Sequence, residues 1–375
     1  QMLSGGAMGG GISSAIARAL GAQRRDDANA LVTHALVVTA LLGAIFCATF
    51  LLFGSALYRS MGARDGSLDA AMTYSNIVFS GIVVTWVMNG AASAIRGTGN
   101  MLVPSIAICV GVVLLFPLSP LLIFGWGPIP GFGIAGGGIA IVVTNVIVLA
   151  SLLIYLALGK AIVRPIATAL RWPMFKEILR VGAVASVSTL QTSLTAGLVT
   201  ALVGTAAGPG AVAGYGTGSR LEFLLVPLVF GLGAPLVALV GTNIGAGQRD
   251  RALKIALTGG FVAFLLTETV GILAALFPHA WLGLFGQDPD MLRVGSAYLR
   301  AVGPFYGFFG LGLSLYFASQ GAGRLGWPLL AGFVRMVVAV GGAWLVLRFA
   351  GSIMWAFVPL AVALVVYGGM LVTAI

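Results

Sequence analysis

The chain has 375 residues, of which 59% are hydrophobic and only 8% charged, with a formal net charge of +10. This composition excludes a water-soluble globular protein, because apolar runs of about 20 or more residues recur along the whole length. The runs do not alternate in hydrophobicity, so they predict transmembrane helices and an all-α polytopic membrane protein.

A Gly- and Ala-rich partial span covers residues 1–20 and is followed by a charged hinge from Gly21 to Ala28. Further spans are predicted at 32–57, 71–95, 101–125, 131–159, 181–206, 209–244, 255–277, 294–319, 326–348 and 353–375. With the partial span, these runs make eleven helical segments.

The first hinge returns 224 positions later, as Gly245 to Ala252. The same offset places Tyr298 on Tyr74 and, further along, Pro328 on Pro104. Matches of Arg, Asp, Tyr and Pro in one register predict two copies of a single unit. An even number of spans separates the hinges, so both copies have one orientation and form a parallel repeat about an axis along the membrane normal.

The repeat also predicts the domain organisation, which is two pseudo-symmetric six-helix lobes. The second copy begins near residue 177, and 177 − 224 = −47, so the first copy would begin about one and a half spans upstream of residue 1. About eleven of the twelve helices are then present. We predict an N-lobe at 1–159 holding helices 2–6, a linker at 160–176 and a C-lobe at 177–375 holding helices 7–12.

Most Lys and Arg residues lie at one set of loops and span ends, and that side is expected to be cytoplasmic. This distribution does not form a basic stripe, so we expect no nucleic-acid partner. The connection from Gly159 to Arg180 is the most basic stretch and contains Pro165 and Pro173. It predicts a helix lying on the anionic inner leaflet, with an ordinary positive-inside loop as the alternative.

Three features together resemble the MATE (multidrug and toxic compound extrusion) transporters. They are the hinge Gly245 to Ala252, the Gly-Ser-Arg-Leu-Glu run from Gly218 to Glu222, and the small-residue opening from Gly5 to Ala19. The resemblance implies two lobes facing a central cleft and alternating access. It also implies a secondary active antiporter that exports amphipathic, mostly cationic compounds, driven by inward flow of Na⁺ or H⁺.

The resemblance further implies a multi-pass protein of the bacterial inner membrane. We expect a monomer whose partners are small amphipathic substrates and membrane lipids, with no metal site and no cofactor other than coupling Na⁺ or H⁺. Well-known members of the family carry an acid in the first helix, which this chain is expected to lack, and some carry further acids in the seventh and tenth helices. The runs 181–206 and 294–319 have no carboxylate, which leaves Na⁺ and H⁺ both open as the coupling ion.

Ionisable groups inside hydrocarbon are costly and tend to be kept for a function or a partner. Glu222 and Glu268 are the acids well inside spans, and Arg220 and Arg335 are the bases there. We predict that both glutamates couple transport by binding H⁺ or Na⁺. The structural alternative is that Glu222 only ties helices together, through a neighbouring Arg or a backbone group. Arg220 is two residues away on the same helix and points to nearly the opposite side.

Aromatic faces attract organic cations, and methionine adapts to varied shapes, which suits a pocket that accepts many compounds. The predicted substrate cleft therefore combines aromatic and amide side chains from both copies with one base: Gln191, Trp86, Asn89, Tyr306, Phe309 and Arg220. Packing or lipid contact is the alternative role for each of the aromatic residues.

We predict no catalytic residues, because the only histidines, His34 and His279, lie near span ends and far apart in the sequence. A channel is disfavoured because no filter motif occurs. The alternative function is a lipid-linked oligosaccharide flippase of the related two-lobe superfamily. Such a protein would line its cleft with several bases, for which Arg220, Arg335 and Arg300 are the candidates.

Overall fold

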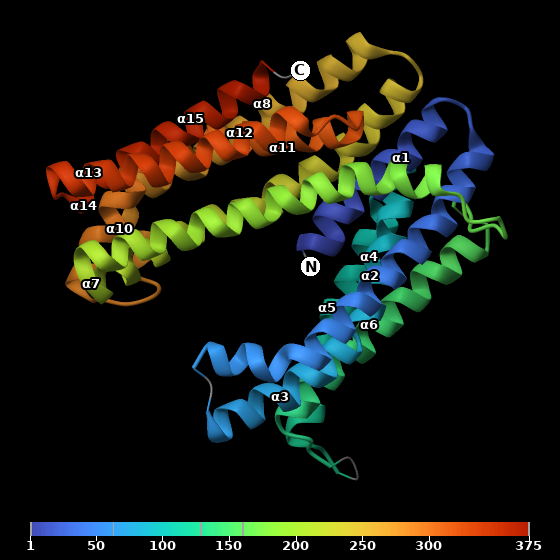
Figure 1. Cartoon of the computed structure of the whole chain (residues 1–375), viewed down its shortest axis with the longest axis horizontal. Helices are drawn as coiled ribbons and strands as arrows, with labels where there is room; N and C mark the ends of the chain where they lie inside the picture. Colours follow the sequence, from blue (N-terminus) through green and yellow to red (C-terminus); the bar gives the residue numbers. More distant parts are fainter. Residues whose placement is uncertain (1, 63, 128–129, 160, 374–375) are drawn as a thin grey trace. The chain divides into compact units, whose positions relative to one another are not determined.

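A computed structural model describes residues 2–62, 64–127, 130–159 and 161–373, and these are built from helices (Figure 1). Eight of the described helices are long and apolar enough to cross a membrane, or nine if the bent pair α3 and α4 is one span. The predicted all-helical membrane fold is thereby confirmed. Residue 1, residue 160 of the predicted linker, and residues 374–375 of the last predicted span lie outside the described residues.

The chain divides into two compact units, Gln1–Gly182 and Ala183–Ile375. Unit 1 contains η1 (Met2–Met8), α1 (Gly9–Gly21), α2 (Arg25–Ser60), α3 (Asp65–Ser80), α4 (Ile82–Arg96), α5 (Leu102–Phe124), α6 (Ile134–Ala157) and the beginning of α7 (Trp172–Gly245). Unit 2 contains the rest of α7, then α8 (Arg249–Leu276), α9 (Pro278–Leu282), α10 (Pro289–Val302), η2 (Gly303–Phe305), α11 (Tyr306–Ala322), α12 (Gly326–Met336), η3 (Val337–Gly341), α13 (Gly342–Ala350), α14 (Ile353–Ala356) and α15 (Val358–Val372). The lobe limits at 159 and 177 stay a prediction.

Helices of the two units begin at matching positions. Five pairs can be compared: α2 and α8 begin at residues 25 and 249, α3 and α10 at 65 and 289, α4 and α11 at 82 and 306, α5 and α12 at 102 and 326, and α6 and α15 at 134 and 358. Each pair differs by 224. The packing also matches, because α4 contacts α2 and α6 in unit 1, just as α11 contacts α8 and α15 in unit 2. The repeat seen in the sequence is therefore present in the helices and in their packing.

The two charged hinges are closed by the same backbone hydrogen bonds. In the first hinge the N–H groups of Ala22, Gln23 and Arg24 donate to the carbonyl oxygens of Arg18, Leu20 and Ala19. The second hinge has the same three backbone hydrogen bonds, between residues whose numbers are each higher by 224. This pattern ends a helix with one residue in the left-handed region, which is Gln23 at φ 60° and Gly247 at φ 75°. The hinges thus fix where the next helix begins in each unit.

The long helix α7 is interrupted at Gly208, whose φ of 78° and ψ of −172° are not helical, and Pro209 follows directly. At about 1.5 Å per residue, the 74 residues of α7 would extend roughly 110 Å, several times the hydrocarbon thickness. The break separates the two spans predicted at 181–206 and 209–244. Residues of both halves can therefore line one site in unit 2.

The connection before α7 lies along α2 and is not helical between residues 161 and 171. Three side chains of α2 hold its backbone, because the N–H groups of Arg164, Ile166 and Arg171 donate to Asn29 Oδ1, Thr33 Oγ1 and His34 Nε2 at 2.9, 3.1 and 2.9 Å. Thr33 Oγ1 also donates to the Ile166 carbonyl at 2.8 Å. The prediction of a surface helix was therefore wrong for residues 161–171. Side chains of α2 bind backbone groups of this segment that would bond to one another within a helix.

Candidate functional site

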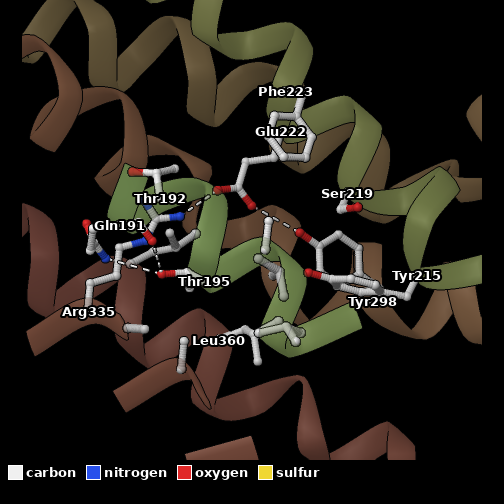
Figure 2. A pocket seen from close by; sticks show the side chains of 16 residues that line it. Gln191, Thr192, Thr195, Tyr215, Ser219, Glu222, Phe223, Tyr298, Arg335 and Leu360 are labelled. Carbon is white, nitrogen blue, oxygen red and sulfur yellow. Dashed lines mark hydrogen bonds and ion pairs between the residues drawn. The ribbon is translucent and has the colours of Figure 1, made fainter. Parts of the chain in front are cut away.

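Figure 2 shows a pocket in unit 2, whose cavity volume is about 70 Å³. Both halves of α7 contribute to it, together with α10, α12, η3 and α15. Its lining residues are Gln191, Thr192, Thr195, Ala196, Val199, Tyr215, Ser219, Glu222, Phe223, Tyr298, Val302, Arg335, Ala339, Leu360, Ala363 and Leu364. The lining thus combines an ion pair, hydroxyl and amide groups, aromatic rings and aliphatic side chains.

Glu222 is bonded through both of its carboxylate oxygens. Arg335 Nη2 donates to Oε1 at 2.7 Å, and the Tyr298 hydroxyl donates to Oε2 at 3.1 Å (Figure 2). The carboxylate of Glu222 therefore joins α7 to α12 and to α10. The side chains of Glu222 and Arg335 are 21% and 16% exposed, so the pair is partly accessible from the pocket.

Aromatic rings surround the ion pair. The guanidinium carbon of Arg335 lies 5.3 Å from the ring centroid of Phe309 and 5.4 Å from that of Tyr367, within the range of cation–π attraction. Tyr215 contacts Tyr298 edge-on, with the ring centroids 5.3 Å apart, and both rings contact Phe357. This packing fixes the position of the Tyr298 hydroxyl beside Glu222.

Gln191 is buried in the pocket wall. Its Nε2 donates to the carbonyl oxygen of Gly332 at 2.8 Å and to Thr195 Oγ1 at 3.2 Å. The first of these bonds connects the first half of α7 to α12, at a residue that lies five positions before the start of the π-helical turn η3. Ala339 of that turn lines the pocket. Such π-helical turns are rare in proteins and occur frequently at functional sites.

The MatE family model matches residues 2–121 and 183–345. The chain belongs to the MATE family. A probable multidrug resistance protein NorM of Thermotoga maritima is 27% identical over 337 residues, which cover 88% of this chain and 71% of that protein. An FAD transporter of Shewanella oneidensis is 27% identical over 318 residues, covering 83% of this chain and 69% of that protein.

Solved structures share the fold of this MATE chain. An outward-facing multidrug resistance MATE family transporter of the MOP superfamily aligns with a TM-score of 0.89 at 23% identity, covering all of this chain and 85% of the other. A MOP superfamily transporter from Pyrococcus furiosus Vc1 aligns with a TM-score of 0.92 at 22% identity, covering all of this chain and 83% of the other. Family membership makes the chain a multi-pass membrane transporter and not an enzyme, in agreement with the sequence prediction.

The structure places two of the residues predicted from the sequence in the pocket, Glu222 and Gln191. Phe309 lies next to the pocket, buried beneath the Arg335 guanidinium. Tyr306 is fully buried in the core of unit 2. The roles of all four in ion coupling or substrate binding stay predictions.

The other four predicted residues lie elsewhere. Glu268 is half-buried on α8, where its Oε2 accepts a hydrogen bond from the Gly307 N–H at 2.6 Å. Arg220 is exposed, with its guanidinium carbon 5.5 Å from the centroid of the Phe285 ring. Trp86 and Asn89 are buried in unit 1, where Trp86 stacks on Phe46 and Asn89 Nδ2 donates to Ser4 Oγ at 2.9 Å. Glu268 and Arg220 therefore do not line the pocket, and Trp86 and Asn89 belong to the other unit.

Sequence reasoning did not include Tyr298 among the site residues, and it named Arg335 only as a base inside a span and as a candidate cleft base of the alternative flippase. Arg335 was identifiable as a base inside a predicted span, and Tyr298 as the repeat partner of Tyr74. Neither signal shows that the two side chains meet Glu222, from which they are 113 and 76 residues distant in the chain. Among the described residues, no group of three His, Cys, Asp or Glu side chains could hold a metal ion.

Proposed function

We propose that this chain is a secondary active antiporter of the bacterial inner membrane. It exports amphipathic, mostly cationic compounds by alternating access, in exchange for Na⁺ or H⁺. The relative from Thermotoga maritima is named a probable multidrug resistance protein, which supports this substrate class. The proposed working unit is a monomer whose partners are small amphipathic molecules and membrane lipids.

The pocket around Glu222 is the observation that carries the proposal. Glu222 is the only acid among the lining residues, and it can neutralise one positive charge on a bound compound. The rings of Tyr215, Tyr298 and Phe223 and the aliphatic side chains of α15 can accept an apolar body. An amphipathic cation therefore finds both of its recognition elements within one pocket.

Antiport follows if the substrate and the coupling ion compete for the same carboxylate. A cation bound to Glu222 leaves on one side of the membrane when H⁺ or Na⁺ takes its place, and the ion leaves when the next substrate arrives. Two ligands that exclude each other at one site are linked reciprocally, since each lowers the affinity for the other by the same factor. Glu268 is proposed as a second coupling acid, although its Oε2 is bonded to the Gly307 amide.

Anionic substrates fit the pocket less well. A lipid-linked oligosaccharide carries a pyrophosphate, and flavin adenine dinucleotide, named for the Shewanella oneidensis relative, is also an anion. Both would require several unpaired bases in the lining. Arg335 is the only base among the sixteen lining residues, and it is already paired with Glu222. The pocket therefore favours cations over these alternatives.

The test is transport by Glu222→Gln in proteoliposomes, measured as ethidium efflux under separate Na⁺ and H⁺ gradients. We expect the variant to fold, because the glutamine amide oxygen can still accept from Arg335 and its NH2 group can donate to the Tyr298 hydroxyl oxygen. We expect it to lose ion-driven efflux, because it cannot carry the exchanged charge. Asp250→Asn is the matched control, since it removes one acid from an exposed position in the first turn of α8. Undiminished, gradient-dependent efflux by folded Glu222→Gln would contradict the proposal.

A further inference from the structure

Arg335 occupies the position on Glu222 that a cationic substrate would need. We propose that Arg335 is the resident counter-cation of Glu222, which each cationic ligand must displace, and that Phe309 and Tyr367 hold its guanidinium after displacement. Arg335 would then determine which cations are accepted. This inference rests on the proposed function, because it assumes that cations bind at Glu222.

The geometry of the pair allows exchange. Only Nη2 of Arg335 bonds to Glu222 Oε1, while Oε2 accepts from Tyr298. The carboxylate is thus shared between two donors, and the stronger two-point fork between guanidinium and carboxylate is not formed. Both side chains of the ion pair are also partly exposed, at 16% and 21%. An incoming cation can therefore reach the carboxylate from the pocket without first unpacking the helices.

Arg335 has a second set of partners that it keeps when it leaves Glu222. The rings of Phe309 on α11 and Tyr367 on α15 lie 5.3 and 5.4 Å from the guanidinium carbon. A guanidinium can remain between two aromatic faces through cation–π attraction. A displaced Arg335 would therefore not be left as an isolated charge in an apolar environment, which would be costly.

The backbone next to Arg335 also favours a movable side chain. The π-helical turn η3 begins at Val337, two residues after Arg335, and Ala339 of this turn lines the pocket. A π-helical turn interrupts the regular hydrogen-bond pattern of an α-helix, so the adjacent turn is less tightly held. Small adjustments of Arg335 between the carboxylate and the rings can occur there without shifting the whole of α12.

A tethered competitor makes the site selective. Because Arg335 is covalently part of the site, it competes at a high effective concentration. A ligand must therefore offer more than a charge, for example an apolar body that binds the rings of Tyr215 and Tyr298. This requirement selects amphipathic organic cations over small hydrophilic ones.

The test is equilibrium binding of tetraphenylphosphonium to purified protein in detergent. Removing a competitor that occupies Glu222 about nine-tenths of the time tightens apparent binding about tenfold. We therefore expect Arg335→Ala to bind the probe about tenfold more tightly than wild type. Millimolar methylguanidinium should weaken binding to Arg335→Ala more than to wild type, because it replaces the missing side chain. If Arg335 has only a structural role, Arg335→Ala should bind the probe more weakly than wild type does, and methylguanidinium should not weaken that binding further.

A second variant tests the inference if Arg335→Ala does not fold. Phe309→Leu combined with Tyr367→Leu removes the rings but keeps the ion pair, so Arg335 loses its alternative position. Apparent binding of tetraphenylphosphonium should then weaken by about threefold. Unchanged binding by this folded variant would overturn the inference.

Failure of the inference differs from failure of the proposed function. If wild type binds the probe and Glu222→Gln does not, cation binding at Glu222 stands. Weaker binding of the probe by folded Arg335→Ala would then contradict this inference but not the proposed function. If wild type and Glu222→Gln bind the probe equally, the role proposed for Glu222 fails and this inference fails with it.

Discussion

Units 1 and 2 share the positions at which their helices begin but differ in the polar side chains that those helices carry. At the offset of 224, Arg335 and Glu268 of unit 2 correspond to Gly111 and Ala44 of unit 1. The described part of unit 1 therefore has neither charge at the matching positions. The comparison teaches that the repeated backbone is set by hinges and apolar lengths, whereas the charges of Arg335 and Glu268 belong to unit 2 alone at these two pairs of positions.

The matching positions Gly111 and Arg335 connect their helices to neighbouring helices in different ways. A Cβ added at Gly111 would meet Val148 Cγ2 at 2.6 Å, so α5 lies very close to α6 in unit 1. In unit 2 the corresponding helix α12 carries Arg335, whose side chain reaches α7 through Glu222. Close apolar packing in one copy is thus matched by an ion pair beside a pocket in the other.

The largest expected effect on stability comes from giving a helix crossing of unit 2 the residue that unit 1 has at the matching position. Gly271 on α8 faces Gly303 of η2 so closely that an added Cβ would collide with the Gly303 carbonyl oxygen. Unit 1 has Cys47 at the matching position. We expect Gly271→Cys to lower the free energy of unfolding by about 2–3 kcal/mol, because neither backbone can move away without disturbing its neighbours. Thermal unfolding of the purified protein in detergent measures this.

The control for Gly271→Cys is Gly231→Ala, at an exposed position where an added Cβ meets nothing within 4 Å. This control should unfold at or above the wild-type temperature, since alanine favours the helix. Equal stability of Gly271→Cys and wild type would show that the crossing tolerates the residue of unit 1, and that the two copies are interchangeable there.

A smaller effect is expected from replacing Glu268 with the alanine that unit 1 has at position 44. Glu268 accepts the N–H of Gly307, in the first turn of α11 directly after η2. Removing a charged acceptor from the buried Gly307 amide should cost about 1.5 kcal/mol. Thermal unfolding of Glu268→Ala in detergent measures the loss.

Glu268→Gln is the matched variant, because its amide oxygen can still accept from Gly307. We expect it to recover most of the stability that Glu268→Ala loses. Its efflux then separates two roles for Glu268: normal efflux indicates a helix-positioning residue, and lost efflux with normal stability indicates a coupling acid. Wild-type stability of Glu268→Ala would speak against the positioning role.

The smallest expected effect concerns the hinges. Gln23 and Gly247 occupy matching left-handed positions, at φ 60° and 75°, but only glycine adopts this region without a steric cost. Gln23→Gly should therefore raise the free energy of unfolding by about 1 kcal/mol, and Gly247→Gln should lower it by about as much. Thermal unfolding of both variants measures the pair, and shifts of the same sign would contradict the equivalence of the hinges.

Much of the fold was predictable because its signals are local. Apolar run length located the spans, and the break in α7 at Gly208 falls between two of the predicted runs. The linker was not predictable, since its non-helical backbone depends on Asn29, Thr33 and His34 of a helix more than 130 residues earlier. Basic composition alone pointed to a surface helix there, and residues 161–171 do not form one.

The candidate site was predictable only in its one acid and one amide. A carboxylate or an amide inside an apolar run can be found from the sequence, so Glu222 and Gln191 were identified. The partners of Glu222 could not be found in this way, because contact with Arg335 and Tyr298 depends on which faces of α7, α10 and α12 turn toward one another. The sequence also assigned Arg220 and Trp86 to the substrate cleft. Arg220 is exposed and does not line the pocket of unit 2, Trp86 is buried in unit 1, and their substrate roles stay predictions.

The sequence by itself determined the membrane class, the spans and the duplicated unit, because hydropathy, hinge residues and a constant offset are properties of short segments read along the chain. Tertiary structure alone decided that Glu222 is paired, that Glu268 accepts a backbone amide, and that one copy holds a polar pocket. These facts depend on helix rotation and on contacts between distant segments. Side-chain packing fixes both, and neither is encoded in any single stretch of residues.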